Sequence, residues 1–157
     1  MILYLSTTTP WRSDYCTEDG RIVYKVNSPR NTWGGAKDIR ITTLGSSATY
    51  STLAQIDYYG ESFFGEQSTI TVGGTTLPAK AVLRKDGWAI FGYGDRLFQG
   101  PDGQIYRWTM DSTKCRLFKK DNDGTLVATY HHESLGILSA ARPASLEISA
   151  SGEQIVD

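Results

Sequence analysis

Residues 96–108 read RLFQGPDGQIYRW and predict the central β-hairpin of this protein. Gly-Pro-Asp-Gly at 100–103 is a turn signal, because proline presets the first turn dihedral and glycine accepts a positive φ. The arms carry Phe98, Tyr106 and Trp108, and aromatic side chains suit a pleated, half-buried surface. Because side chains alternate along a strand, we expect one face to hold Gln104, Tyr106 and Trp108 and the other Ile105, Arg107 and Thr109.

Short runs with strand-like alternation continue on both sides of this hairpin and are separated by turn residues. Predicted strands lie at residues 2–7, 21–26, 38–44, 49–59, 68–72, 75–77, 114–119, 125–132 and 145–148. Residues 11–19 are expected to be irregular, and a single helical turn is expected over 79–84, after Pro78. About ten short strands at this spacing favour an all-β barrel or sandwich.

The composition is that of one globular domain spanning residues 1–157. Its 39% hydrophobic and 21% charged residues exclude a disordered chain. The net charge of −1 provides no general attraction to nucleic acid or to an anionic membrane. The charge is unevenly distributed, however: residues 84–120 carry eight Lys/Arg and four Asp/Glu, which makes this segment mildly basic. A solvated face is the favoured interpretation of that segment, and an anion-binding patch is the alternative.

The two cysteines, Cys16 and Cys115, are far apart and match no metal or redox spacing. No apolar run approaches the roughly 20 residues of a membrane-spanning helix, and the N-terminus does not read as a secretory signal. We therefore expect a cytoplasmic protein with free thiols and no transmembrane segment. A disulfide between the two cysteines is the less favoured alternative.

Several phrases of the chain resemble a known family. They include Leu3-Tyr4-Leu5-Ser6, the hairpin sequence with Tyr106 and Trp108, and the stretches 126–132 and 144–148. The pattern is similar to the fungal domain family of unknown function 6593, which is grouped with the tubby-like proteins. Relatives in that wider group are the tubby C-terminal domain, the plant LURP-one proteins and the phospholipid scramblases.

The resemblance implies a tubby-like antiparallel β-barrel of roughly ten to twelve strands. In that family an apolar segment follows the position of Asp157 and forms a central helix, and this helix is expected to be absent here. An unfilled barrel would expose apolar area worth about 25 cal/mol per Å². We therefore expect an exposed apolar groove, or a homo-oligomer that covers it.

One cluster, His131, His132 and Glu133, carries catalytic residue types. On a strand the two histidines point to opposite faces, so they cannot share a metal without a bend, and no third ligand stands at a set spacing. No cofactor motif or metal site is expected, and a strand end with one solvent-facing histidine is the favoured interpretation. These three residues remain the catalytic candidates.

The basic residues of the middle segment are the candidates for ligand binding. They lie on two neighbouring predicted strands: Arg107, Lys114, Arg116 and Lys119. In the tubby relatives a basic barrel surface holds phosphoinositide headgroups, and the transfer to this chain is an analogy at the level of the fold.

The sequence favours a non-enzymatic intracellular binding module whose partner is an anionic lipid headgroup or a protein, and not nucleic acid. The first alternative is a small-molecule-binding or hydrolytic barrel that uses a cleft at His131, His132 and Glu133. The second is a carbohydrate-binding fungal defence protein with an aromatic surface that draws on Trp11, Trp33 and Trp88.

Overall fold

The computed structural model describes residues 1–28, 37–45, 49–58, 67–86, 94–110, 114–134 and 142–153. Contacts between Cα atoms divide the chain into two compact units. Unit 1 comprises Met1–Tyr4 and Leu83–Asp157, and unit 2 comprises Leu5–Val82. Each unit is described by itself below, and a single domain over 1–157 stays a prediction.

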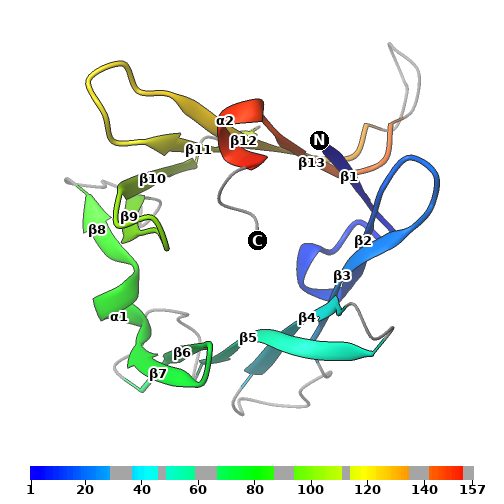
Figure 1. The fold of residues 1–157 in the computed structure, drawn as a ribbon, viewed down its shortest axis with the longest axis horizontal. Coiled ribbons are helices and arrows are strands. Elements are labelled where there is room, and N and C mark those ends of the chain that lie inside the picture. The colour runs from blue at the N-terminus through cyan, green and yellow to red at the C-terminus, as the bar shows by residue number, and fades with distance from the viewer. Residues whose placement is uncertain are drawn as a thin grey trace. The chain divides into compact units, whose positions relative to one another are not determined.

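Unit 1 is an antiparallel sheet with the hydrogen-bonding order β1-β13-β12-β11-β10-β9-β8. Its helix α2 (Ala150–Glu153) packs against β12 and β13, and Gly152 is buried there. A Cβ atom at Gly152 would lie 2.5 Å from the carbonyl oxygen of Val127, so only glycine fits this contact. The strands, drawn in Figure 1, are β1 (Ile2–Leu5), β8 (Arg84–Asp86), β9 (Asp95–Gln99), β10 (Ile105–Met110), β11 (Lys114–Lys119), β12 (Leu126–His131) and β13 (Ser145–Ile148).

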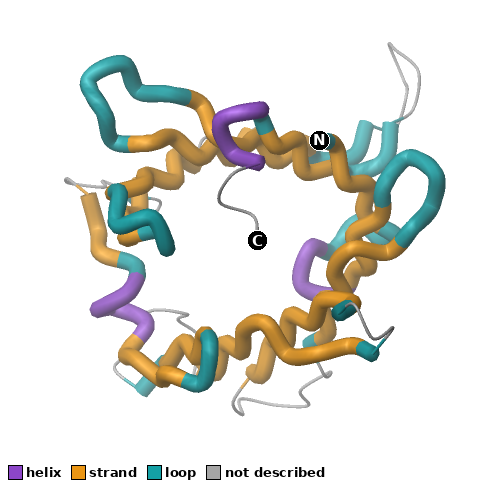
Figure 2. The backbone as a smooth tube through the Cα atoms, in the orientation of Figure 1, coloured by secondary structure: helices purple, strands orange, loops and turns teal. Residues whose placement is uncertain are grey.

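Unit 2 is an antiparallel sheet with the order β7-β6-β5-β4-β3-β2. In the described residues its helices are two short turns, the 3₁₀ turn η1 (Pro10–Arg12) and α1 (Ala79–Val82), drawn in purple in Figure 2. Apolar side chains of β4 to β7 share one face, because Ile39, Ile56, Ile70 and Leu77 are in register. The strands are β2 (Ser13–Cys16), β3 (Ile22–Asn27), β4 (Lys37–Leu44), β5 (Tyr50–Tyr58), β6 (Thr69–Val72) and β7 (Thr75–Pro78).

The all-β prediction is confirmed. By hydrogen bonding, the described strands form a single thirteen-stranded antiparallel sheet whose edge strands are β7 and β8. Hydrogen bonds do not close this sheet into a barrel, because its two edge strands do not pair with each other, and it has one strand more than the expected upper limit of about twelve. No long helix occurs among the described residues.

Two local predictions were wrong. Residues 11–19 were expected to be irregular, but Ser13–Cys16 forms β2, which pairs with β3 across a bulge between Tyr15 and Cys16. Ser, Asp and Cys give this segment no clear alternation of apolar and polar residues, and pairing with β3 stabilises the strand. The helical turn expected over 79–84 ends at Val82, and Arg84–Asp86 forms strand β8.

The central hairpin is confirmed, including its faces. Tyr106 pairs with Phe98 and Trp108 with Arg96, so the even-numbered residues of β10 share one side. The Tyr106 ring stacks on Phe98 with centroids 5.5 Å apart, and its residue is only 2% exposed. Its hydroxyl donates a 2.8 Å hydrogen bond to the Asp102 carboxylate, which ties the strand to its own turn.

The same carboxylate organises the turn backbone. Asp102 Oδ1 accepts a 3.0 Å bond from the Gln104 amide, and Gly103 has a φ of +76°. Burial acts to raise the pKa of Asp102, but the hydrogen bonds from Tyr106 and Gln104 outweigh it and hold the pKa below its ordinary value. The turn is therefore held by a charged acceptor with two donors.

Gly100 is required for a steric reason. A Cβ atom there would lie 2.5 Å from Tyr106 Cε2 and 2.9 Å from Asp102 Oδ1. We expect Gly100→Ala to lower the free energy of unfolding by about 1–3 kcal/mol, because the buried ring has to move. Urea unfolding measures this.

In the control, Gly45→Ala, the Cβ atom would lie 3.4 Å from the Thr49 carbonyl oxygen. This variant should change stability by less than ~0.5 kcal/mol; equal losses in both would contradict the explanation.

Stability should fall at alkaline pH through Tyr106. Burial, followed by the bond to Asp102, raises its pKa from 10.0 to about 12. Above pH 10.0 the unfolded chain loses this proton first, so the stabilisation that is complete below pH 10.0 is lost as the pH rises towards about 12. Urea unfolding from about pH 9 to 11.5 measures the slope.

Tyr106→Phe is the matched variant for this slope. Burial also raises the pKa of Tyr130, so the variant should flatten the alkaline loss of stability without abolishing it. An unchanged slope in Tyr106→Phe would show that the hydroxyl of Tyr106 is not the group that titrates.

Candidate functional site

The register of unit 1 places polar residues in two neighbouring rows on one face of the sheet. One row runs Thr109, Arg116, Thr129, Glu147 and Ile2 across β10, β11, β12, β13 and β1. The second row is Lys114, His131, Ser145 and Tyr4. Because these rows lie two residues apart along each strand, they face the same side, which we call the polar face.

The intervening row points to the opposite side and is apolar. It consists of Cys115, Tyr130, Leu146 and Leu3, and Leu3 is fully buried. Leu117, Ala128 and Ile148 follow on that same apolar side and are also buried. The burial of this side stabilises the sheet and fixes which residues must face outward.

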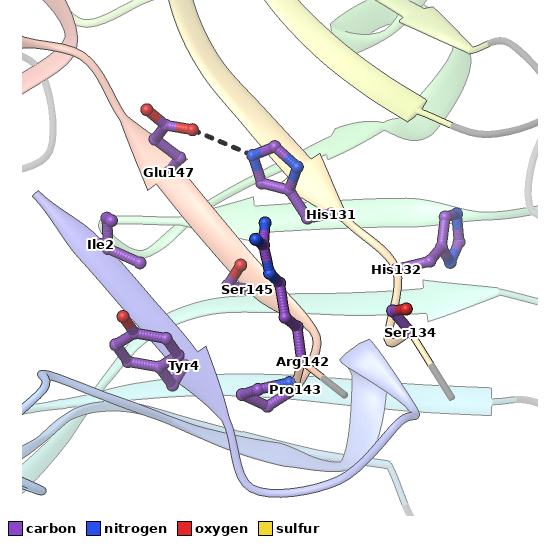
Figure 3. Close-up of a pocket in the computed structure, with 9 residues that line it drawn as sticks. All are labelled: Ile2, Tyr4, His131, His132, Ser134, Arg142, Pro143, Ser145 and Glu147. Atoms are coloured by element: carbon purple, nitrogen blue, oxygen red, sulfur yellow. Dashed lines mark hydrogen bonds and ion pairs between the residues drawn. The ribbon is translucent and has the colours of Figure 1, made fainter. Parts of the chain in front are cut away.

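A groove opens on the polar face at β1, β12 and β13, with a volume of about 830 Å³. Such a volume lies within the range of about 300–1,000 Å³ that is usual for small-ligand sites. Its lining mixes hydroxyl groups, imidazoles, one guanidinium and one carboxylate, as Figure 3 shows. The lining residues are Ile2, Tyr4, His131, His132, Ser134, Arg142, Pro143, Ser145 and Glu147.

His131 is held by Glu147 across the strand pair. Its Nε2 lies 3.0 Å from Glu147 Oε2, and the side chains are 38% and 56% exposed. The His132 ring lies apart from His131 in Figure 3 and packs edge-on against Tyr130, with centroids 4.9 Å apart. The two imidazoles therefore have different partners, although both line the groove.

Arg142 enters the groove from a backbone bridge. The amide and carbonyl groups of Ser134 and Arg142 exchange hydrogen bonds of 2.9 and 3.1 Å. Figure 3 shows the Arg142 side chain extending over Ser145 towards the His131 ring. Within the described residues its guanidinium forms no ion pair or hydrogen bond.

The structure brings three of the four predicted ligand-binding residues together. Arg107 lies two residues from Thr109 on β10, so it shares the polar face with Lys114 and Arg116. Lys119 pairs with Tyr106 and therefore lies on the opposite side of the sheet. The prediction from two neighbouring strands could not separate these sides, because it lacked the register.

The predicted catalytic cluster is placed differently from expectation. His131 and His132 line the groove, but Glu133 is not among its lining residues. The carboxylate beside His131 belongs to Glu147, which is sixteen residues away in sequence. Sequence reasoning missed Glu147 because only the pairing of β12 with β13 brings it there. The alternation along Ser145–Ile148 predicted a strand that contains Glu147, but it did not identify β12 as the partner of that strand.

Among the residues that the structure describes, no three His, Cys, Asp or Glu side chains are grouped so that they could hold a metal ion. Cys16 and Cys115 are not joined in a disulfide. The described helices are all too short and too polar to span a lipid bilayer.

A comparison with protein-family models matches residues 5–157 to a family of unknown function, DUF6593. The chain belongs to this family. Searches of curated proteins and of solved structures found no match. The match confirms the family of unknown function that the sequence resembles, and it assigns no activity to the chain.

The pair of His131 and Glu147 should contribute little to folding, because both side chains are exposed. A double-mutant cycle of His131→Gln and Glu147→Gln should give a coupling free energy below about 1 kcal/mol in urea unfolding. Such a value would leave both groups available to a ligand. A coupling of several kcal/mol would instead identify a structural pair.

Proposed function

We propose that this protein is a non-enzymatic intracellular binding module that docks on anionic lipid headgroups through its polar face. The observation that carries the proposal is the register that places Arg107, Lys114 and Arg116 on one side of two adjacent strands, β10 and β11. Cations on one face add their attraction for an anionic surface, at about 1 kcal/mol for each Lys or Arg near it.

The charge pairing on this face leaves cations available. Arg107 is held only loosely by Asp95, with 3.9 Å between Nε and Oδ2. Glu147 faces His131, and Arg116 has no ion pair within the described residues. An exposed pair such as Arg107 with Asp95 is weak enough to yield to a headgroup phosphate.

We also propose that the sheet is a relative of the fungal tubby-like barrels. Support comes from the antiparallel, almost entirely sequential strand order and from the family match. The apolar face of unit 2 carries Val72 and Leu77, which are 55% and 48% exposed. Such a face accords with a fold that needs a further apolar element to cover it.

Binding is favoured over hydrolysis by the surroundings of His131. Among the described residues its ring is hydrogen-bonded to Glu147 and to no hydroxyl group, so the imidazole activates no serine, threonine or tyrosine there. The carbohydrate alternative gains only Trp11, which is 51% exposed. Trp33 and Trp88 lie outside the described residues.

Sedimentation with vesicles tests the proposed function. We expect the protein to bind phosphatidylcholine vesicles that contain phosphatidylserine, and not pure phosphatidylcholine, with affinity that falls as salt rises. The double variant Arg107→Ala/Arg116→Ala should weaken this binding by about tenfold or more, since it removes two cations from the surface.

Lys119→Ala is the matched control, because it removes a cation from the opposite side of the same strand. It should leave vesicle binding nearly unchanged. If Lys119→Ala weakens binding as much as Arg116→Ala alone, the effect is one of net charge and the polar face has no special role. Absence of binding to any anionic vesicle would refute the proposed function.

A further inference from the structure

The groove holds a cation that nothing within the described residues neutralises. Arg142 is exposed and forms no ion pair there, and it points along the groove towards His131 (Figure 3). Glu147, the one carboxylate among the described lining residues, is engaged with His131 at 3.0 Å. A guanidinium placed beside hydroxyl groups in a concave site is the usual arrangement for holding an oxyanion.

We infer that this groove binds a phosphate monoester group, with Arg142 as its main anion-binding residue. The inference deepens and rests on the proposed function, because it assigns headgroup recognition to one place on the polar face. The hydroxyl-bearing residues Tyr4, Ser134 and Ser145 line the same groove and supply further donors. A monoester presents three terminal oxygens to these donors, whereas a diester presents two.

The charges around His131 favour an anion. Glu147 faces it from β13, Lys114 lies opposite it on β11, Arg142 extends towards it from the Ser134 bridge, and Tyr4 ends the row on β1. With a neutral imidazole, the guanidinium of Arg142 and the carboxylate of Glu147 balance each other in charge. A protonated imidazole adds one net positive charge, and its contact with Glu147 is then an ion pair.

Anion binding should therefore be linked to uptake of a proton by His131. In the neutral ring only one nitrogen donates, and the carboxylate of Glu147 takes that donor. In the charged ring both nitrogens donate, so the second can serve the anion. Histidine ordinarily titrates between about pH 5 and 8, which makes the linkage measurable.

Amide chemical shifts in NMR titrations of the full chain test the inference. Inorganic phosphate should shift the amides of Ser134, Arg142 and Ser145, and Arg142→Gln should weaken its binding by about tenfold or more. The control Arg116→Gln removes the same charge from the polar face outside the groove lining, and should change the affinity much less. Equal weakening by the two variants, or no shifts at these amides, would overturn the inference.

Inorganic sulfate tests the proton linkage, because it keeps its charge over the range in which histidine titrates. Its affinity should rise several-fold from about pH 7.5 to about pH 5.5. His131→Gln should abolish that rise. A rise that persists in His131→Gln would contradict the role given to this imidazole.

Vesicles separate the sources of the phosphate. Phosphatidic acid carries a monoester and phosphatidylglycerol a diester, so binding should favour phosphatidic acid, and Arg142→Gln should remove that preference. If phosphate binds the groove but no vesicle binds, the ligand is a soluble monoester and the proposed function fails alone. If vesicles bind without any preference and phosphate does not shift the groove, the proposed function stands and this inference fails.

Discussion

The register of the antiparallel strands is the constraint on which the rest of unit 1 depends. A row of apolar residues, Cys115, Tyr130, Leu146 and Leu3, must stay on the buried side, because exposing it would cost the sheet its stability. A slip of one residue would turn that row to solvent and bury the row of Lys114 and His131 instead. The polar face and its groove are therefore consequences of burying the opposite side.

The chemistry of the groove follows from the way its charged side chains are paired. The carboxylate of Glu147 is engaged with His131, while Arg142, held by backbone hydrogen bonds to Ser134, lines the same groove. Because these side chains are exposed, they contribute little to stability and can be retained for binding. The function proposed above, recognition of an anion, uses these exposed groups.

Much of the fold could be predicted from local pattern, and the site only in part. The Gly100–Gly103 turn, the faces of β10 and the span of β13 all followed from turn chemistry and alternation. Strand β2 did not, because its polar residues carry no periodic signal. His131 and His132 were found as residue types, but Glu147 was missed, since its partner strand is set by long-range pairing.

By itself, the sequence determined that this chain is all-β, where its central hairpin turns, and which residues alternate along each strand, because these depend on neighbouring residues. Only the tertiary structure decided that Lys119 faces away from Arg107 and Arg116, and that Glu147 stands beside His131. It also decided that hydrogen bonds leave β7 and β8 as the sheet edges. The physical reason is that pairing between strands far apart in sequence depends on burial of a shared apolar side, which no local pattern encodes.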